Sequence, residues 1–155
     1  MQERRTARRL ALDVLYEAEI RDQLPAEALV ARGSNGWVRS TPGDELATPE
    51  GDPPREAMLY ARELIEGVQE HQAAIDELMA RYADRWAIAR MPVVDRTLLR
   101  MALFELLWGR DIPIPVAINE AVELAKDLST EDSGRFINGL LGRVVDDQKA
   151  DRTRS

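Results

Sequence analysis

The chain contains no cysteine and a single histidine, His71. Without cysteine it forms neither disulfide bridges nor thiolate zinc sites, and one histidine is too few for a histidine-based metal cluster. We therefore expect no metal ion and no cofactor. The lack of disulfides is compatible with a reducing compartment.

Long apolar runs are also missing. No run approaches the roughly 20 residues that a membrane-spanning helix needs, and the arginine-rich start lacks the apolar core of a secretory signal. The sequence therefore predicts a cytoplasmic protein that does not enter a membrane.

The common enzyme motifs are absent as well. The sequence has no glycine loop with the spacing that holds phosphates, no nucleophile elbow and no cysteine nucleophile. Acidic pairs such as Glu131 with Asp132 are typical of solvated helix ends. These absences favour a binding protein over an enzyme.

Apolar residues recur at intervals of three and four along nearly the whole chain, and alternating β-branched runs are absent. The pattern predicts an all-α protein with one domain at about residues 1–148 and a polar tail at 149–155. We expect helices at about 4–21, 25–32, 92–108, 116–128 and 133–147, and one long helix or two in succession from residue 54. Residues 33–55 hold four glycines and four prolines, which predicts a flexible insertion.

Three glycines stand at informative places in the predicted helices. Gly109 follows the helix expected at 92–108 and predicts its end. Gly139 and Gly142 interrupt the last helix, where each costs about 1 kcal/mol relative to alanine. Their presence predicts the close approach of another helix or of a ligand.

Asp132 or Ser133 is the expected cap at the start of the last helix.

Positive charge gathers at the start of the chain, although the formal net charge is -7. Four arginines lie on an arc of roughly 140° of the first helix, away from its apolar stripe: Arg4, Arg5, Arg8 and Arg9. Tyr16 continues this row. Guanidinium groups pair with phosphates and an exposed aromatic ring stacks on an unpaired base, so the pattern favours single-stranded RNA as the ligand. A solvated face, an acidic protein partner and a membrane surface stay open as alternatives on these residues alone.

The second half of the chain carries a longer pattern. The segments "VDRTLLRMALFEL", "INEAVELAK" and "FINGLLG" resemble the NusB family of bacterial transcription antitermination factors. The resemblance covers the arginine helix and about residues 56–146, and implies about six to seven helices in two small subdomains. It also implies binding of the boxA element in nascent ribosomal RNA together with NusE, a small-subunit ribosomal protein, and association with the elongating RNA polymerase.

The resemblance further implies which residues bind. By matching position, the RNA contacts fall on Arg4, Arg5 and Arg8 with Arg9 adjacent, on Tyr16, on Tyr82 and Arg85, and on Asp132 and Phe136. The NusE contact falls on Asp95. Core packing is the alternative role for Tyr82 and Phe136, and a helix cap is the alternative for Asp132.

Two other functions compete with RNA-binding antitermination. The first is a protein-interaction or homodimerising module in ribosome biogenesis, whose arginines dock an acidic partner or a second copy without direct RNA readout. The second is the RNA-binding appendage of a ribosomal RNA cytosine methyltransferase, since those enzymes carry a similar domain. The absence of a methyltransferase region disfavours it.

Overall fold

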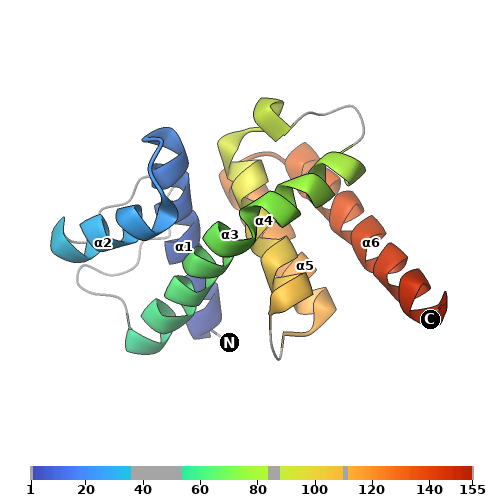
Figure 1. Ribbon diagram of the computed structural model, residues 1–155, viewed down its shortest axis with the longest axis horizontal. Helices are drawn as coiled ribbons and strands as arrows, with labels where there is room; N and C mark the ends of the chain where they lie inside the picture. Colours follow the sequence, from blue (N-terminus) through green and yellow to red (C-terminus); the bar gives the residue numbers. More distant parts are fainter. Residues whose placement is uncertain (1, 36–53, 84–87, 110–111, 155) are drawn as a thin grey trace. The chain divides into compact units, whose positions relative to one another are not determined.

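The computed structural model describes residues 2–35, 54–83, 88–109 and 112–154. They form six α-helices and one short 3-10 helix: α1 (Gln2–Ile20), α2 (Pro25–Asn35), α3 (Arg55–Tyr82), η1 (Ile88–Arg90), α4 (Val93–Trp108), α5 (Ile114–Leu128) and α6 (Glu131–Arg154) (Figure 1). These residues contain no strand, which confirms the all-α prediction. The chain divides into two compact units, Met1–Gln72 and Ala73–Ser155, in agreement with the expected two subdomains.

The first unit holds α1, α2 and the beginning of α3. The five residues of the predicted apolar stripe of α1 are all buried: Ala7, Leu10, Ala11, Val14 and Ala18. Leu12 is buried too, so α1 is enclosed over a wider arc than the stripe alone. Pro25 begins α2 at a first helical turn, as predicted. The backbone N–H of Ala26 donates to Gln69 Oε1 at 2.8 Å, so a side chain of α3 caps the start of α2.

The segment between α2 and α3 differs in part from the prediction. α2 continues to Asn35, into the expected insertion, and α3 begins at Arg55. Residues 36–53 lie outside the described residues. From Arg55 to Tyr82 the chain is one unbroken helix, so the single long helix is the correct one of the two predicted alternatives.

The second unit holds the end of α3 together with η1, α4, α5 and α6. The helix α4 is apolar on nearly every side and is buried from Val94 to Glu105 except at Arg96, and it contacts both α5 and α6. α6 turns its apolar stripe inward: Ile137, Leu140, Leu141 and Val144 are buried, while Phe136 and Val145 are half-buried. The core of this unit therefore follows the sequence pattern closely.

The ends of α4 and α6 have specific causes. Gly109 ends α4 as predicted, with φ −69°, and a Cβ there would lie 2.3 Å from the carbonyl oxygen of Glu105. Glycine is needed here for space and not for a left-handed backbone. At the start of α6 the Ser133 N–H donates to Thr130 Oγ1 at 2.9 Å, so Thr130 is the cap in place of Asp132 or Ser133. α6 also continues to Arg154, through the segment predicted as a polar tail.

Candidate nucleic-acid interface

The four arginines of α1 differ in exposure. Arg5 is exposed and Arg4 and Arg9 are half-buried, but Arg8 is only 3% exposed. The expectation that Arg8 lies on the solvent side of the helix is therefore wrong. Its guanidinium carbon lies 6.0 Å from the centroid of the Tyr60 ring, so a residue of α3 covers the part of α1 that the sequence pattern placed in water.

Tyr60 also contacts Arg4, whose guanidinium carbon lies 4.9 Å from the same ring centroid. Both distances are within the roughly 6 Å of a cation–π interaction. Within the described residues, the ring of Tyr60 is the contact that the structure gives Arg4. The sequence pattern did not single out Tyr60, because its role depends on the packing of α3 against α1 and not on local spacing.

Tyr16 lies further along α1 and is half-buried, so part of its ring reaches the surface. Leu12, which lies one helical turn before Tyr16 and between it and the arginines, is 0% exposed. The row of arginines and tyrosine is thus interrupted by a core residue. Tyr16 and the arginines form two separate surface features of α1 instead of one continuous strip.

The predicted contact region at the end of α3 is held against α6. The Tyr82 hydroxyl donates to Asp147 Oδ2, and the Tyr82 carbonyl oxygen accepts a hydrogen bond from Arg143 Nη2 at 2.9 Å. The Tyr82 side chain is half-buried, and a cationic partner for the carbonyl end of a helix is electrostatically favourable. Arg85, the predicted neighbour of Tyr82, lies outside the described residues.

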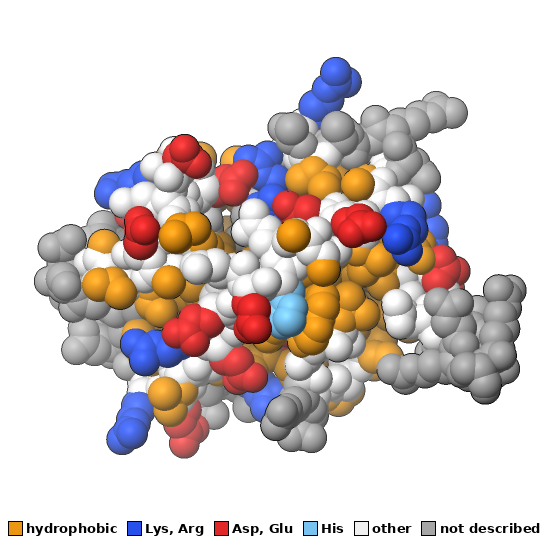
Figure 2. Space-filling view, in the orientation of Figure 1, with side chains coloured by type: hydrophobic (Ala, Val, Ile, Leu, Met, Phe, Trp, Pro, Cys, Tyr) orange, Lys and Arg blue, Asp and Glu red, His pale blue; other side chains and the backbone are white. Residues whose placement is uncertain are grey.

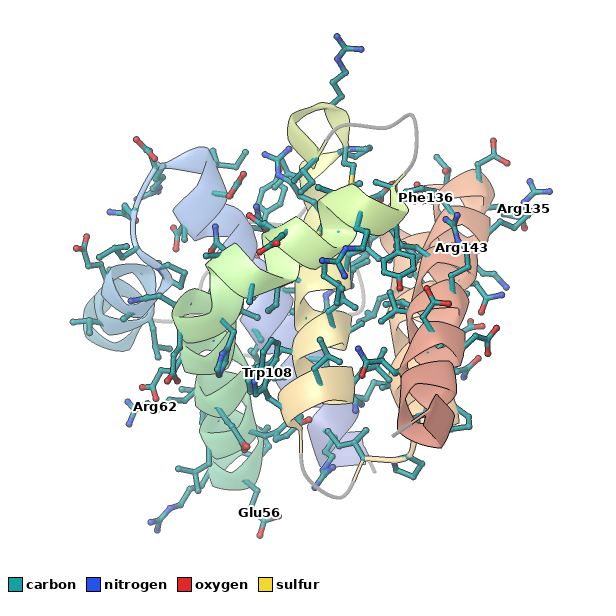
Figure 3. All side chains as sticks on the ribbon, turned by 45° about the vertical axis from the view of Figure 1, so that its right-hand side comes forward. Glu56, Arg62, Trp108, Arg135, Phe136 and Arg143 are labelled. Atoms are coloured by element: carbon teal, nitrogen blue, oxygen red, sulfur yellow. The ribbon has the colours of Figure 1, made fainter. Side chains whose placement is uncertain are left out.

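The first turns of α6 carry the other predicted residues. Asp132 is exposed and accepts a hydrogen bond from Arg135, and Phe136 is half-buried. Figure 3 shows Phe136, Arg135 and Arg143 along α6. Arg135 and Arg143, separated by eight residues, are both exposed.

The part of the chain that the structure describes shows no candidate metal site and no candidate membrane-spanning helix. No group of three or more histidine, aspartate and glutamate side chains there is arranged to hold a metal ion. None of the helices described combines the length and apolar character that crossing a membrane requires. On the face that Figure 2 shows, acidic and basic side chains are interspersed.

Comparison with known proteins identifies the family. The model of the NusB family matches residues 5–146. The chain is also 47% identical over 146 residues to the transcription antitermination protein NusB of Salinispora arenicola, a match that covers 94% of this chain and 97% of that protein. The chain belongs to the NusB family. The resemblance seen in the sequence is thereby confirmed.

Solved NusB structures have a similar fold. NusB from T. maritima aligns with a TM-score of 0.72 and 37% sequence identity, over 91% of this chain and 89% of that chain. The fold is also similar to a chain from a crystal structure of the antitermination factors NusB and NusE in complex with dsRNA, with a TM-score of 0.73 and 24% identity. That alignment covers 93% of this chain and 96% of the other.

In this NusB-family chain the predicted NusE contact at Asp95 is overturned. Asp95 stands in the first turn of α4 and is 0% exposed, so it has no surface to offer a partner. Its Oδ2 accepts a hydrogen bond from Ser133 Oγ at 2.6 Å. Ser133 Oγ also lies 3.0 Å from the hydroxyl oxygens of Ser129 and Thr130. Asp95 therefore connects the beginnings of α4 and α6 from inside the unit.

The close approach predicted at two glycines of α6 is not made within the described residues. A Cβ added at Gly139 or at Gly142 meets no atom within 4 Å. None of the helices that the structure describes is therefore the reason for either glycine. A ligand that approaches α6 closely is the alternative that stays open.

Alanine at Gly139 is expected to raise the free energy of unfolding by about 0.5 to 1 kcal/mol, because it lowers the entropy of the unfolded chain and meets no neighbour. Urea denaturation of Gly139→Ala and the wild type measures this gain. A loss of stability would contradict the open surroundings of the site. Unchanged RNA and NusE binding by the same variant would exclude a close-approaching ligand at this glycine.

Proposed function

We propose that the protein is an RNA-binding transcription antitermination factor without enzymatic activity. It binds boxA-type single-stranded RNA in nascent ribosomal RNA, acts with NusE, and joins the RNA polymerase elongation complex. The relatives described above are named transcription antitermination proteins, and one solved neighbour is a complex of NusB and NusE with dsRNA. Membership of their family supports the proposal.

The observation that carries the RNA contact is the state of Arg4 and Arg5 at the start of α1. Arg5 is exposed, and within the described part of the chain Arg4 contacts the aromatic ring of Tyr60 and no carboxylate. Their guanidinium groups suit bidentate pairing with phosphates. Arg8, being buried, supports them from within the unit. Tyr16, Tyr82 and Phe136 each retain partly exposed rings on which unpaired bases stack.

A specific observation favours a second candidate function, the protein-interaction or homodimerising module. Four large apolar side chains of the first unit are exposed: Ile20, Leu24, Val30 and Leu59. Exposed apolar side chains are a feature of protein-binding surfaces when they are contiguous. This function predicts that partner binding persists without any RNA affinity.

Replacing Arg4 and Arg5 together by alanine is expected to weaken binding to a single-stranded boxA RNA and to flatten its salt dependence. Each phosphate contact contributes about 0.7 to the slope of log affinity against log salt for single strands, so the loss of two contacts lowers the slope by about 1.4. Fluorescence anisotropy across a range of salt concentrations, with and without NusE, measures both quantities.

The matched control replaces two exposed arginines of the same unit, Arg21 and Arg62, by alanine. These side chains are 65% and 61% exposed and pair with Glu17 and Glu66. Replacing them removes the same amount of charge and leaves Arg4 and Arg5 unchanged. Equal slopes for the wild type and Arg4→Ala/Arg5→Ala would overturn the arginine contact. NusE binding without salt-dependent RNA binding would favour the protein-interaction module.

A further inference from the structure

Tyr60 gives the start of α1 an internal support that the proposed function does not itself explain. One ring lies 4.9 Å from the guanidinium carbon of Arg4 and 6.0 Å from that of Arg8. The two arginines are four residues apart and therefore lie one above the other on the helix. A single aromatic ring thus receives two successive cationic side chains of the same helical face.

We propose that Tyr60 is a positioning residue for RNA phosphate, which holds the guanidinium group of Arg4 over its ring. This inference rests on the proposed function and names how its cationic site is ordered. The π-system of the ring attracts the charge of the guanidinium, whereas a carboxylate would accept hydrogen bonds from its N–H groups. Support by a ring therefore leaves N–H donors available for a phosphate.

Other arginines of the described residues are held differently. Arg100 donates from Nε and Nη2 to the two carboxylate oxygens of Asp76, and Arg135 donates to Asp132. A carboxylate occupies the same edge donors that a phosphate requires. Such an arginine has fewer free donors to offer a phosphate. Arg4 keeps its aromatic support when the phosphate arrives.

The support also limits the freedom of a long side chain. Arg4 and Tyr60 are both half-buried, so each is partly ordered by the unit. Ordering a flexible side chain on binding weakens an interaction, and a side chain already held in place loses less freedom. Arg8, which is almost completely buried, lies 6.0 Å from the centroid of the same ring. The expected result is a guanidinium aimed at solvent before RNA is present.

The test is a double-mutant cycle in the full chain with single-stranded boxA RNA as the probe. Tyr60→Phe keeps the ring and should bind within about twofold of the wild type. Tyr60→Leu keeps an apolar side chain but removes the π-system, and should weaken binding about 3- to 10-fold and lower the salt slope by up to about 0.7. In the Arg4→Ala background, Tyr60→Leu should change affinity by less than about twofold.

Circular dichroism and urea denaturation establish that each variant is folded, and Tyr60→Met provides the same test if Tyr60→Leu does not fold. Unchanged affinity and slope in the ring-deleted variants, beside a salt-dependent wild type, would overturn the inference and leave the proposed function standing. An equal loss in the Arg4→Ala background would also overturn it, since Tyr60 would then act independently of Arg4. A wild type without salt-dependent RNA binding would remove the proposed function itself.

Discussion

Alanine at Ser133 is expected to lower the free energy of unfolding by about 3 kcal/mol. Asp95 is 0% exposed and its Oδ2 accepts a hydrogen bond from Ser133, while its Oδ1 has no hydrogen-bond partner among the described residues. Removing the Ser133 hydroxyl leaves a buried carboxylate without any hydrogen bond. Urea denaturation should show a lower midpoint with an unchanged m-value.

Measuring Ser133→Ala in a second mutant background distinguishes the loss of this hydrogen bond from a general loss of packing. The Asp95→Ala variant has no buried carboxylate that could lose its hydrogen bond. Adding Ser133→Ala to it should therefore lower the free energy of unfolding by less than about 1 kcal/mol. If Ser133→Ala costs the same in both backgrounds, the hydrogen bond between Ser133 and Asp95 does not explain the loss. The smaller cost would establish Asp95 as an internal link between α4 and α6.

Alanine at Asp76 is expected to lower the free energy of unfolding by about 2 to 3 kcal/mol. Asp76 accepts hydrogen bonds from Arg100 Nε at 2.8 Å and from Arg100 Nη2 at 3.0 Å. The Arg100 side chain is only 10% exposed, so loss of the carboxylate leaves a poorly solvated guanidinium without that partner. The 29% exposure of Asp76 keeps the expected loss below that of a fully buried pair. Thermal and urea unfolding both measure it.

α3 also offers a matched ion pair on the surface. Glu66 lies 3.9 Å from Arg62, and their side chains are 60% and 61% exposed. Glu66→Ala should change the free energy of unfolding by less than about 0.5 kcal/mol, because water solvates both charges. A loss as large as that of Asp76→Ala would show that burial does not distinguish the two pairs.

Local pattern was sufficient for most of the fold. The spacing of Leu10 and Val14 placed the buried side of α1, and the apolar run around Leu98 and Leu103 placed α4 at the centre of its unit. Gly109 marked the end of α4 for a reason that the structure alone revealed, the space needed beside Glu105. Periodicity reports which residues face a core, because burial repeats with the turn of the helix.

The binding residues depended on contacts between distant segments. Arg8 looked exposed because its own helix places it with the other arginines, yet Tyr60 from α3 lies over it. Asp95 looked like a surface carboxylate at a helix start, yet it is buried inside the unit and accepts a hydrogen bond from Ser133. Single-sequence spacing describes one helix at a time. It does not indicate which segment covers a charged side chain after folding.

Tyr82 ties the last turn of α3 to α6 by two hydrogen bonds. Its hydroxyl and its carbonyl oxygen bind Asp147 and Arg143, two residues one helical turn apart on α6. Helix termini are ordinarily among the first parts of a protein to fray. This terminus frays only if two bonds to another helix break together. The Tyr82 side chain is therefore held by α6 at its hydroxyl end and at its backbone, and under the proposed function a base that stacks on it would meet a ring that is already ordered.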